Sequence, residues 1–138
     1  MIYHTSDDGP PAYSEGTAVG SFRDLDAAVL RAVRRIERFT GPKFDMIVVQ
    51  GVSGMSLGFP LALKLGMDIV VVRKDGDENH CGKERIITGS SVTGKKLLFV
   101  DDFISGGTTR QRVRTAVEAE GGKVVGEYTS RENTLTKA

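Results

Sequence analysis

The stretch Lys96–Thr109, KLLFVDDFISGGTT, decides the fold and the chemistry that we expect of this chain. Its first part is an apolar run of strand length, typical of a strand buried in a parallel sheet. A bend rich in glycine and threonine follows, and a helical pattern from Thr108 to Glu120 begins at once. Glycines let backbone N–H groups approach an anion, and a helix N-terminus adds unpaired donors and partial positive charge. We therefore predict a phosphate cup formed by Gly106, Gly107, Thr108 and Thr109.

Two adjacent carboxylates, Asp101 and Asp102, stand between the predicted strand and the bend. Two negative charges beside a phosphate would repel it, so they make chemical sense if they bind neutral hydroxyls or an ion. A sugar phosphate presents both kinds of group, the phosphate for the cup and the ribose diol for the acids. The same carboxylates would stabilise positive charge that develops at a sugar carbon. The segment therefore predicts a sugar-phosphate ligand.

Helices and apolar strands alternate along the rest of the chain. Apolar positions from Leu25 to Phe39 recur at steps typical of an amphipathic helix, which Gly41-Pro42 ends. Continuous apolar strands that alternate with helices imply a mainly parallel sheet covered on both faces, so we predict an α/β fold with four or five strands flanked by helices. Ligands bind outside the carboxyl ends of the strands in such sheets. The other expected elements are strands over Phe44–Gln50, Asp68–Arg73 and Lys123–Thr129, a turn over Gly51–Gly54, a helix over Met55–Leu65, and irregular segments over 1–20, 75–94 and the polar tail.

The segment Val100–Thr109 resembles, without a gap, the phosphoribosyl pyrophosphate (PRPP) signature of type I phosphoribosyltransferases. That signature is an apolar strand end, two acidic residues, two apolar residues, a variable position, a small residue, Gly, one further residue and Thr. This chain departs from it at Gly106, where Thr is common. The resemblance implies displacement of pyrophosphate from PRPP by a nucleobase nitrogen, with Asp101 and Asp102 as the catalytic residues on the ribose hydroxyls. It also implies that Ser105 joins the cup that holds the 5-phosphate.

Other segments fall where this family binds pyrophosphate. Gly51, Val52, Ser53 and Gly54 resemble its pyrophosphate loop, although the Arg or Lys that many members carry there is missing. The resemblance implies Mg²⁺ held mainly by the substrate and water, with Asp101 or Asp102 as candidate ligands. The remaining residues expected on pyrophosphate are cations, Arg73 and Lys74 after one strand and Lys83 and Arg85 in the loop 75–94, which corresponds to a mobile flap.

Composition narrows the class of protein. The 138 residues fit one domain over residues 1–138, and a net charge of +1 gives no support for a nucleic-acid partner. The absence of a long apolar run argues against a membrane span. A single cysteine, Cys81, together with the polar N-terminus favours the cytoplasm, and one Cys with two His is too few for a closed zinc site. The partners implied by the resemblance are PRPP, a nucleobase and a second copy of the chain.

Three points stay open at this stage. A base-binding hood is not evident, so the alternative is a PRPP- or nucleotide-sensing module with the same fold and little catalysis. A receiver-like or phosphatase-like domain that uses the acid pair for Mg²⁺ ranks last, because Asp101 and Asp102 come late in the chain and precede a phosphate cup. Ser105 at the variable position resembles adenine- or orotate-type loops, and Phe103 and Ile104 either flank a planar base or belong to the core.

Overall fold

A six-stranded sheet, in the order β3-β2-β1-β4-β5-β6, forms the centre of the computed structural model, which describes residues 22–73, 86–104 and 107–138. The four inner strands pair in parallel, and the edge strands β3 and β6 are antiparallel to their neighbours. The sheet is therefore mainly parallel, as the alternating pattern predicts. The elements in chain order are α1 (Phe22–Glu37), β1 (Met46–Val49), α2 (Gly51–Leu65), β2 (Asp68–Val72), β3 (Ile87–Thr88), β4 (Lys96–Asp101), α3 (Thr108–Ala119), β5 (Lys123–Thr129) and β6 (Thr134–Lys137).

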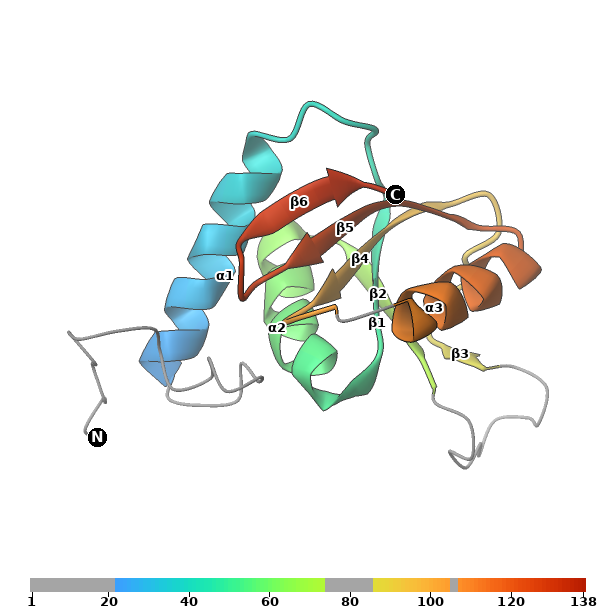
Figure 1. The fold of residues 1–138 in the computed structure, drawn as a ribbon, viewed down its shortest axis with the longest axis horizontal. Coiled ribbons are helices and arrows are strands. Elements are labelled where there is room, and N and C mark those ends of the chain that lie inside the picture. Colours follow the sequence, from blue (N-terminus) through green and yellow to red (C-terminus); the bar gives the residue numbers. More distant parts are fainter. Residues whose placement is uncertain (1–21, 74–85, 105–106) are drawn as a thin grey trace.

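Helices cover both faces of the sheet, with α1 and α2 on one face and α3 on the other (Figure 1). Alternate residues of the central strands point to opposite faces of the sheet. Val49 and Val100 pack under α1 and α2, whereas Val48 and Phe99 pack under α3. Burial on both faces explains why β1 and β4 are continuous apolar runs. The carboxyl ends of β1, β4 and β5 consequently meet at one edge of the sheet.

The expectation of four or five strands was too low because two edge strands were missed. Strand β3 lies inside the segment 75–94 that we expected to be a loop, and β6 lies in the tail that we expected to be irregular. Each has a single buried side chain, Ile87 in β3 and Leu135 in β6. Short edge strands carry too little apolar pattern to be recognised without their partner strands.

Helix α2 begins earlier than the sequence predicts. The segment Gly51–Gly54, expected to be a turn, is its first turn, and Pro60 lies well inside the helix. Gly51 has a φ of 79°, a conformation that favours glycine, so the chain leaves β1 and enters the helix without a separate turn. The left-handed Gly66, with a φ of 67°, ends α2 as expected. Among the described residues, no helix is long and apolar enough to cross a membrane.

Candidate functional site

The acid pair lies at the carboxyl edge of the sheet, where parallel strands are expected to bind ligands. Asp101 is the last residue of β4 and Asp102 follows it, and the two residues are only 6 % and 5 % exposed. Backbone hydrogen bonds continue the β4–β5 pairing past both, because the N–H groups of Ser130 and Arg131 donate to the carbonyls of Asp101 and Asp102 at 3.0 and 2.9 Å. The carboxylates therefore stand on a fixed backbone.

Three hydrogen bonds hold the two carboxylates of this pair in place. Asp101 Oδ1 accepts the backbone N–H of Asp102 at 2.8 Å and the hydroxyl of Ser53 at 3.3 Å. Asp102 Oδ1 accepts the backbone N–H of Phe103 at 2.8 Å. The other oxygen of that carboxylate, Asp102 Oδ2, is buried and has no hydrogen-bond partner among the described residues. A buried carboxylate oxygen in this condition is ready to accept from a hydroxyl or bind a cation.

The two carboxylates do not both carry a full charge at neutral pH. Burial, together with the hydrogen bond and the charge of Asp102, raises the pKa of Asp101 to about 7, although the Asp102 N–H and the Ser53 hydroxyl act in the opposite direction. Near pH 7 the pair therefore spends much of its time with a proton on Asp101. This lowers the repulsion that two charged acids would exert on a neighbouring phosphate.

The predicted pyrophosphate loop packs against this pair. A Cβ atom added to Gly54 would lie 3.3 Å from the Val100 carbonyl oxygen and 3.8 Å from Asp101 Oδ1, so glycine lets α2 approach the end of β4. That approach places Ser53 on Asp101, although we expected Ser53 to face pyrophosphate. Val52 points outward and is exposed. The structure thus brings Gly51–Gly54 and the acid pair into one site.

The described part of the predicted phosphate cup is the N-terminus of α3. Gly107 is the N-cap residue, Thr108 and Thr109 begin the helix, and no side chain among the described residues caps it. A Cβ atom on Gly107 would meet no described atom within 4 Å. Gly107 and Thr108 also line an open groove of about 660 Å³ that reaches Ile86. Within the described residues, the backbone donors of the first turn are thus not used by a side-chain cap, whereas Ser105 and Gly106 lie outside the described residues.

Comparison with known proteins identifies the family of this site. No family model matches the chain. The chain is 30 % identical over 125 residues to adenine phosphoribosyltransferase of Streptococcus uberis, covering 77 % of this chain and 73 % of that protein. The chain belongs to the type I phosphoribosyltransferase family.

Further similarities agree with this phosphoribosyltransferase assignment. Orotate phosphoribosyltransferase of Metarhizium anisopliae is 31 % identical over 110 residues, which are 74 % of this chain but 47 % of that protein. The crystal structure of Francisella tularensis orotate phosphoribosyltransferase has the same fold, with a TM-score of 0.65 at 21 % identity over 80 % of this chain and 52 % of that one. A Mycobacterium tuberculosis orotate phosphoribosyltransferase solved with PRPP gives a TM-score of 0.62 at 24 % identity, covering 84 % and 69 %. The chain spans 47 % and 58 % of the lengths of the orotate enzyme of M. anisopliae and the adenine enzyme of Geobacter metallireducens, so these relatives are longer.

The cations expected on pyrophosphate lie only partly within the described residues of this chain. Arg73 follows β2 at the same edge of the sheet, is half-buried, and its backbone N–H donates to the Ile86 carbonyl at 2.8 Å. The contact joins the end of β2 to the start of β3. Lys74, Lys83 and Arg85 lie outside the described residues, so their roles stay predictions.

Sequence reasoning missed two buried polar residues of this edge. Gln50 ends the β1 segment and Ser130 follows β5, so they stand at the carboxyl ends of the strands on either side of β4. Gln50 Nε2 and Ser130 Oγ are buried and have no hydrogen-bond partner among the described residues. Gln50 directly follows the apolar run of β1, and that position is a signal that would have identified it, whereas Ser130 comes after the polar Thr129 and carries no comparable signal.

The two apolar residues after the acid pair play different parts. Ile104 packs with the core under α3, whereas Phe103 is 39 % exposed beside Asp102. The Arg131 guanidinium carbon lies 4.7 Å from the centre of the Phe103 ring, a cation–π contact. Of the two residues expected either to flank a base or to fill the core, Phe103 is thus the one placed at the surface of the site.

Proposed function

We propose that this chain is an enzyme that transfers the 5-phosphoribosyl group of PRPP to a nucleobase nitrogen and releases pyrophosphate. One observation carries the proposal: within the described residues, a buried acid pair with an unpartnered carboxylate oxygen lies just upstream of a glycine-containing helix N-terminus that has no side-chain cap. A phosphate suits the helix terminus, and ribose hydroxyls suit the carboxylates. The similarity to adenine and orotate phosphoribosyltransferases supports a purine or pyrimidine as acceptor.

In this proposal the acid pair acts on the ribose. Asp102 Oδ2 accepts a hydrogen bond from one ribose hydroxyl, and the Asp101 carboxyl, whose pKa is about 7, forms a hydrogen bond with the second hydroxyl. As the bond from C1 to pyrophosphate weakens, positive charge grows on the sugar, and the carboxylates stabilise it without having to move. The first-turn N–H groups at Gly107, Thr108 and Thr109, with Ser105 and Gly106, hold the 5-phosphate.

The pyrophosphate is proposed to lie along Gly51, Val52, Ser53 and Gly54, with Arg73, Lys74, Lys83 and Arg85 as its cations. Mg²⁺ fits a site of this kind, because buried carboxylate oxygens such as Asp102 Oδ2 are donors that it prefers. No group of three or more His, Cys, Asp or Glu among the described residues forms a metal cage. Mg²⁺ would therefore arrive mainly on the substrate and water and would neutralise the leaving diphosphate.

One observation favours a second candidate function, a PRPP- or nucleotide-sensing module with little catalysis. The segment Gly51–Gly54 carries no Arg or Lys, and its hydroxyl on Ser53 is bonded to Asp101. A site that holds the sugar phosphate firmly but the leaving group weakly would bind PRPP and turn it over slowly. The proposed single domain over 1–138, with a flap over 75–94, suits either function.

Calorimetry with PRPP and Mg²⁺, followed by a pyrophosphate-release assay across nucleobases, tests the enzyme proposal. We expect saturable PRPP binding and release of one pyrophosphate for each nucleotide formed with at least one of adenine, hypoxanthine, guanine, uracil and orotate. Omitting the base should leave only slow hydrolysis, which is the internal control. Tight binding without turnover for any base would favour the sensing module, and no PRPP binding would contradict both functions.

The proposal includes the cytoplasm as the location and a homodimer as the assembly, and the apolar surface of α2 supports the homodimer. Val52, Phe59 and Leu63 of this helix are exposed, and Leu63, 85 % exposed, borders a groove of about 330 Å³ between α1 and α2. Exposed apolar side chains in a row mark protein interfaces. In sedimentation velocity we expect a dimer that Leu63→Glu weakens by at least about tenfold, while Ile86→Glu, also at an exposed apolar position, does not. A wild-type chain that sediments as a monomer at all concentrations would contradict this part of the proposal.

A further inference from the structure

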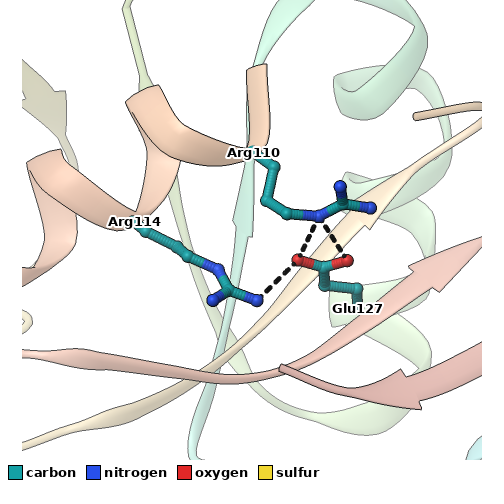
Figure 2. Close-up of polar contacts among 3 residues, drawn as sticks. All are labelled: Arg110, Arg114 and Glu127. Atoms are coloured by element: carbon teal, nitrogen blue, oxygen red, sulfur yellow. Dashed lines mark hydrogen bonds and ion pairs between the residues drawn. The ribbon is translucent and has the colours of Figure 1, made fainter. Parts of the chain in front are cut away.

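A buried carboxylate under α3 takes no part in the reaction proposed above. Glu127 lies within β5 and is only 6 % exposed. An unpaired carboxylate at such a site is strongly unfavourable. Two arginines of α3, one helical turn apart, neutralise it, as Figure 2 shows: Arg110 Nε lies 2.9 Å from both carboxylate oxygens, and Arg114 Nη2 donates to Oε2 at 3.0 Å.

This cluster of three charges connects the first turn of α3 to the sheet. Arg110 follows Thr109 directly and belongs to the first turn, the same turn that presents the N–H groups of the cup. The buried apolar residues of α3 are Val113, Ala116 and Val117, all beyond that turn. The Arg110–Glu127 ion pair is therefore a contact between the first turn of the helix and the sheet.

We propose that Glu127 is a positioning residue for the phosphate cup. With Arg110 and Arg114 it forms a clamp that holds the first turn of α3, and so its N–H groups, in the geometry that a phosphate monoester requires. The inference rests on the proposed function, because it assumes that this helix terminus binds the 5-phosphate. It assigns to a residue of β5, remote from the PRPP signature in sequence, control over the affinity of that site.

Two physical effects of the clamp have opposite signs and can be separated. Two guanidinium groups and one carboxylate leave one net positive charge beside the cup. If this charge were the main effect, Glu127→Gln would add positive charge and tighten anion binding, while Arg110→Gln would weaken it. If positioning is the main effect, both substitutions weaken binding, and the double variant is little worse than either single variant.

Ribose 5-phosphate is the probe, with its dissociation constant measured by calorimetry for the wild type, Glu127→Gln, Arg110→Gln and the double variant. We expect each single variant to bind ribose 5-phosphate about tenfold more weakly, because the loss of a charge-assisted contact usually has an effect of about this size. Hydrogen exchange of the Gln111 amide, which donates to the Gly107 carbonyl at 2.8 Å, should be faster in the same variants.

Thr93→Val is the matched control, because it acts on the other end of the same helix. The Thr93 hydroxyl donates to the Glu120 carbonyl at 2.8 Å, just beyond the last turn of α3. Its loss should lower stability, yet leave ribose 5-phosphate binding within about twofold of the wild type and Gln111 exchange unchanged. A general loosening of the fold would instead affect binding in both sets of variants.

Each outcome decides between the alternatives. A wild-type chain that does not bind ribose 5-phosphate would overturn the proposed function and the clamp together. Wild-type binding with unchanged affinity in both single variants, or tighter binding by Glu127→Gln, would overturn the clamp alone. If Glu127→Gln does not fold, Arg110→Gln, whose side chain is partly exposed, still tests the clamp through its affinity and its Gln111 exchange.

Discussion

Joint replacement of Asp101 and Asp102 by asparagine should lower phosphoribosyl transfer at least about 10³-fold, because preorganised charges aimed at developing charge are worth about two to three orders of magnitude. Asparagine keeps the size of each side chain and the backbone hydrogen bonds from Ser130 and Arg131. It removes the acceptor at Asp102 Oδ2 and the titrating group at Asp101. The pyrophosphate-release assay measures the loss.

Asp45→Asn is the control for this prediction. Asp45 Oδ2 accepts the Lys96 backbone N–H at 3.0 Å, at the opposite end of the same strand β4. The same chemical change there should leave turnover within about twofold, since it lies outside the carboxyl edge. Transfer activity that survives in the Asp101→Asn/Asp102→Asn variant would contradict the role given to the acid pair.

The second large effect concerns stability and pH. The pKa of Asp101 is about 7 in the folded chain against a reference value of 3.8, so between these values the folded state binds more protons than the unfolded state. The free energy of unfolding should therefore fall as pH rises through this window and level off above about pH 7. A shift of this size corresponds to at most about 4 kcal/mol. Asparagine at position 101 cannot ionise and should escape the loss.

Urea denaturation of the wild type and Asp101→Asn at pH 5, 6, 7 and 8 checks this prediction. We expect the variant to gain stability relative to the wild type progressively, reaching its largest advantage at pH 8. Other titrating groups cancel in the difference between the two chains. Parallel curves for the two proteins over this range would show that Asp101 does not ionise with a raised pKa.

A stabilised but inactive Asp101→Asn chain would have a functional meaning. Burial of an acid that resists ionisation weakens the fold, and the position is filled by Asp all the same. Functional sites often carry such destabilising groups because their chemistry requires them. The two predictions together therefore separate a catalytic acid pair from a structural one.

The parallel core could be predicted from sequence because its strands are buried on both faces. The run from Leu97 to Val100 is continuously apolar, and α1 shows a clear helical period, so neither needs tertiary information. The edge strands β3 and β6 could not be predicted, since two to four residues with one buried side chain make no pattern. The start of α2 was missed because glycines that allow close packing look the same in a sequence as glycines that make a turn.

The candidate site also has a part that local sequence predicts and a part that it does not. The phosphate cup and the acid pair are contiguous in sequence and were predicted, whereas their supports come from elsewhere in the chain. Ser53 reaches Asp101 across 48 residues, and Glu127 reaches Arg110 across 17. A glutamate inside a strand and two arginines on a helix resemble ordinary surface charges until the fold brings them together. Local sequence therefore pointed to the groups that are proposed to contact the ligand, but not to the groups that hold them.

A crystal structure with PRPP and Mg²⁺ bound would test most directly whether the segment from Asp101 to Thr109 binds both the ribose hydroxyls and the 5-phosphate. We expect the 5-phosphate on the main-chain N–H groups that open α3 and the ribose hydroxyls on Asp101 and Asp102. PRPP found elsewhere, or an acid pair that turns away from its sugar, would contradict the account.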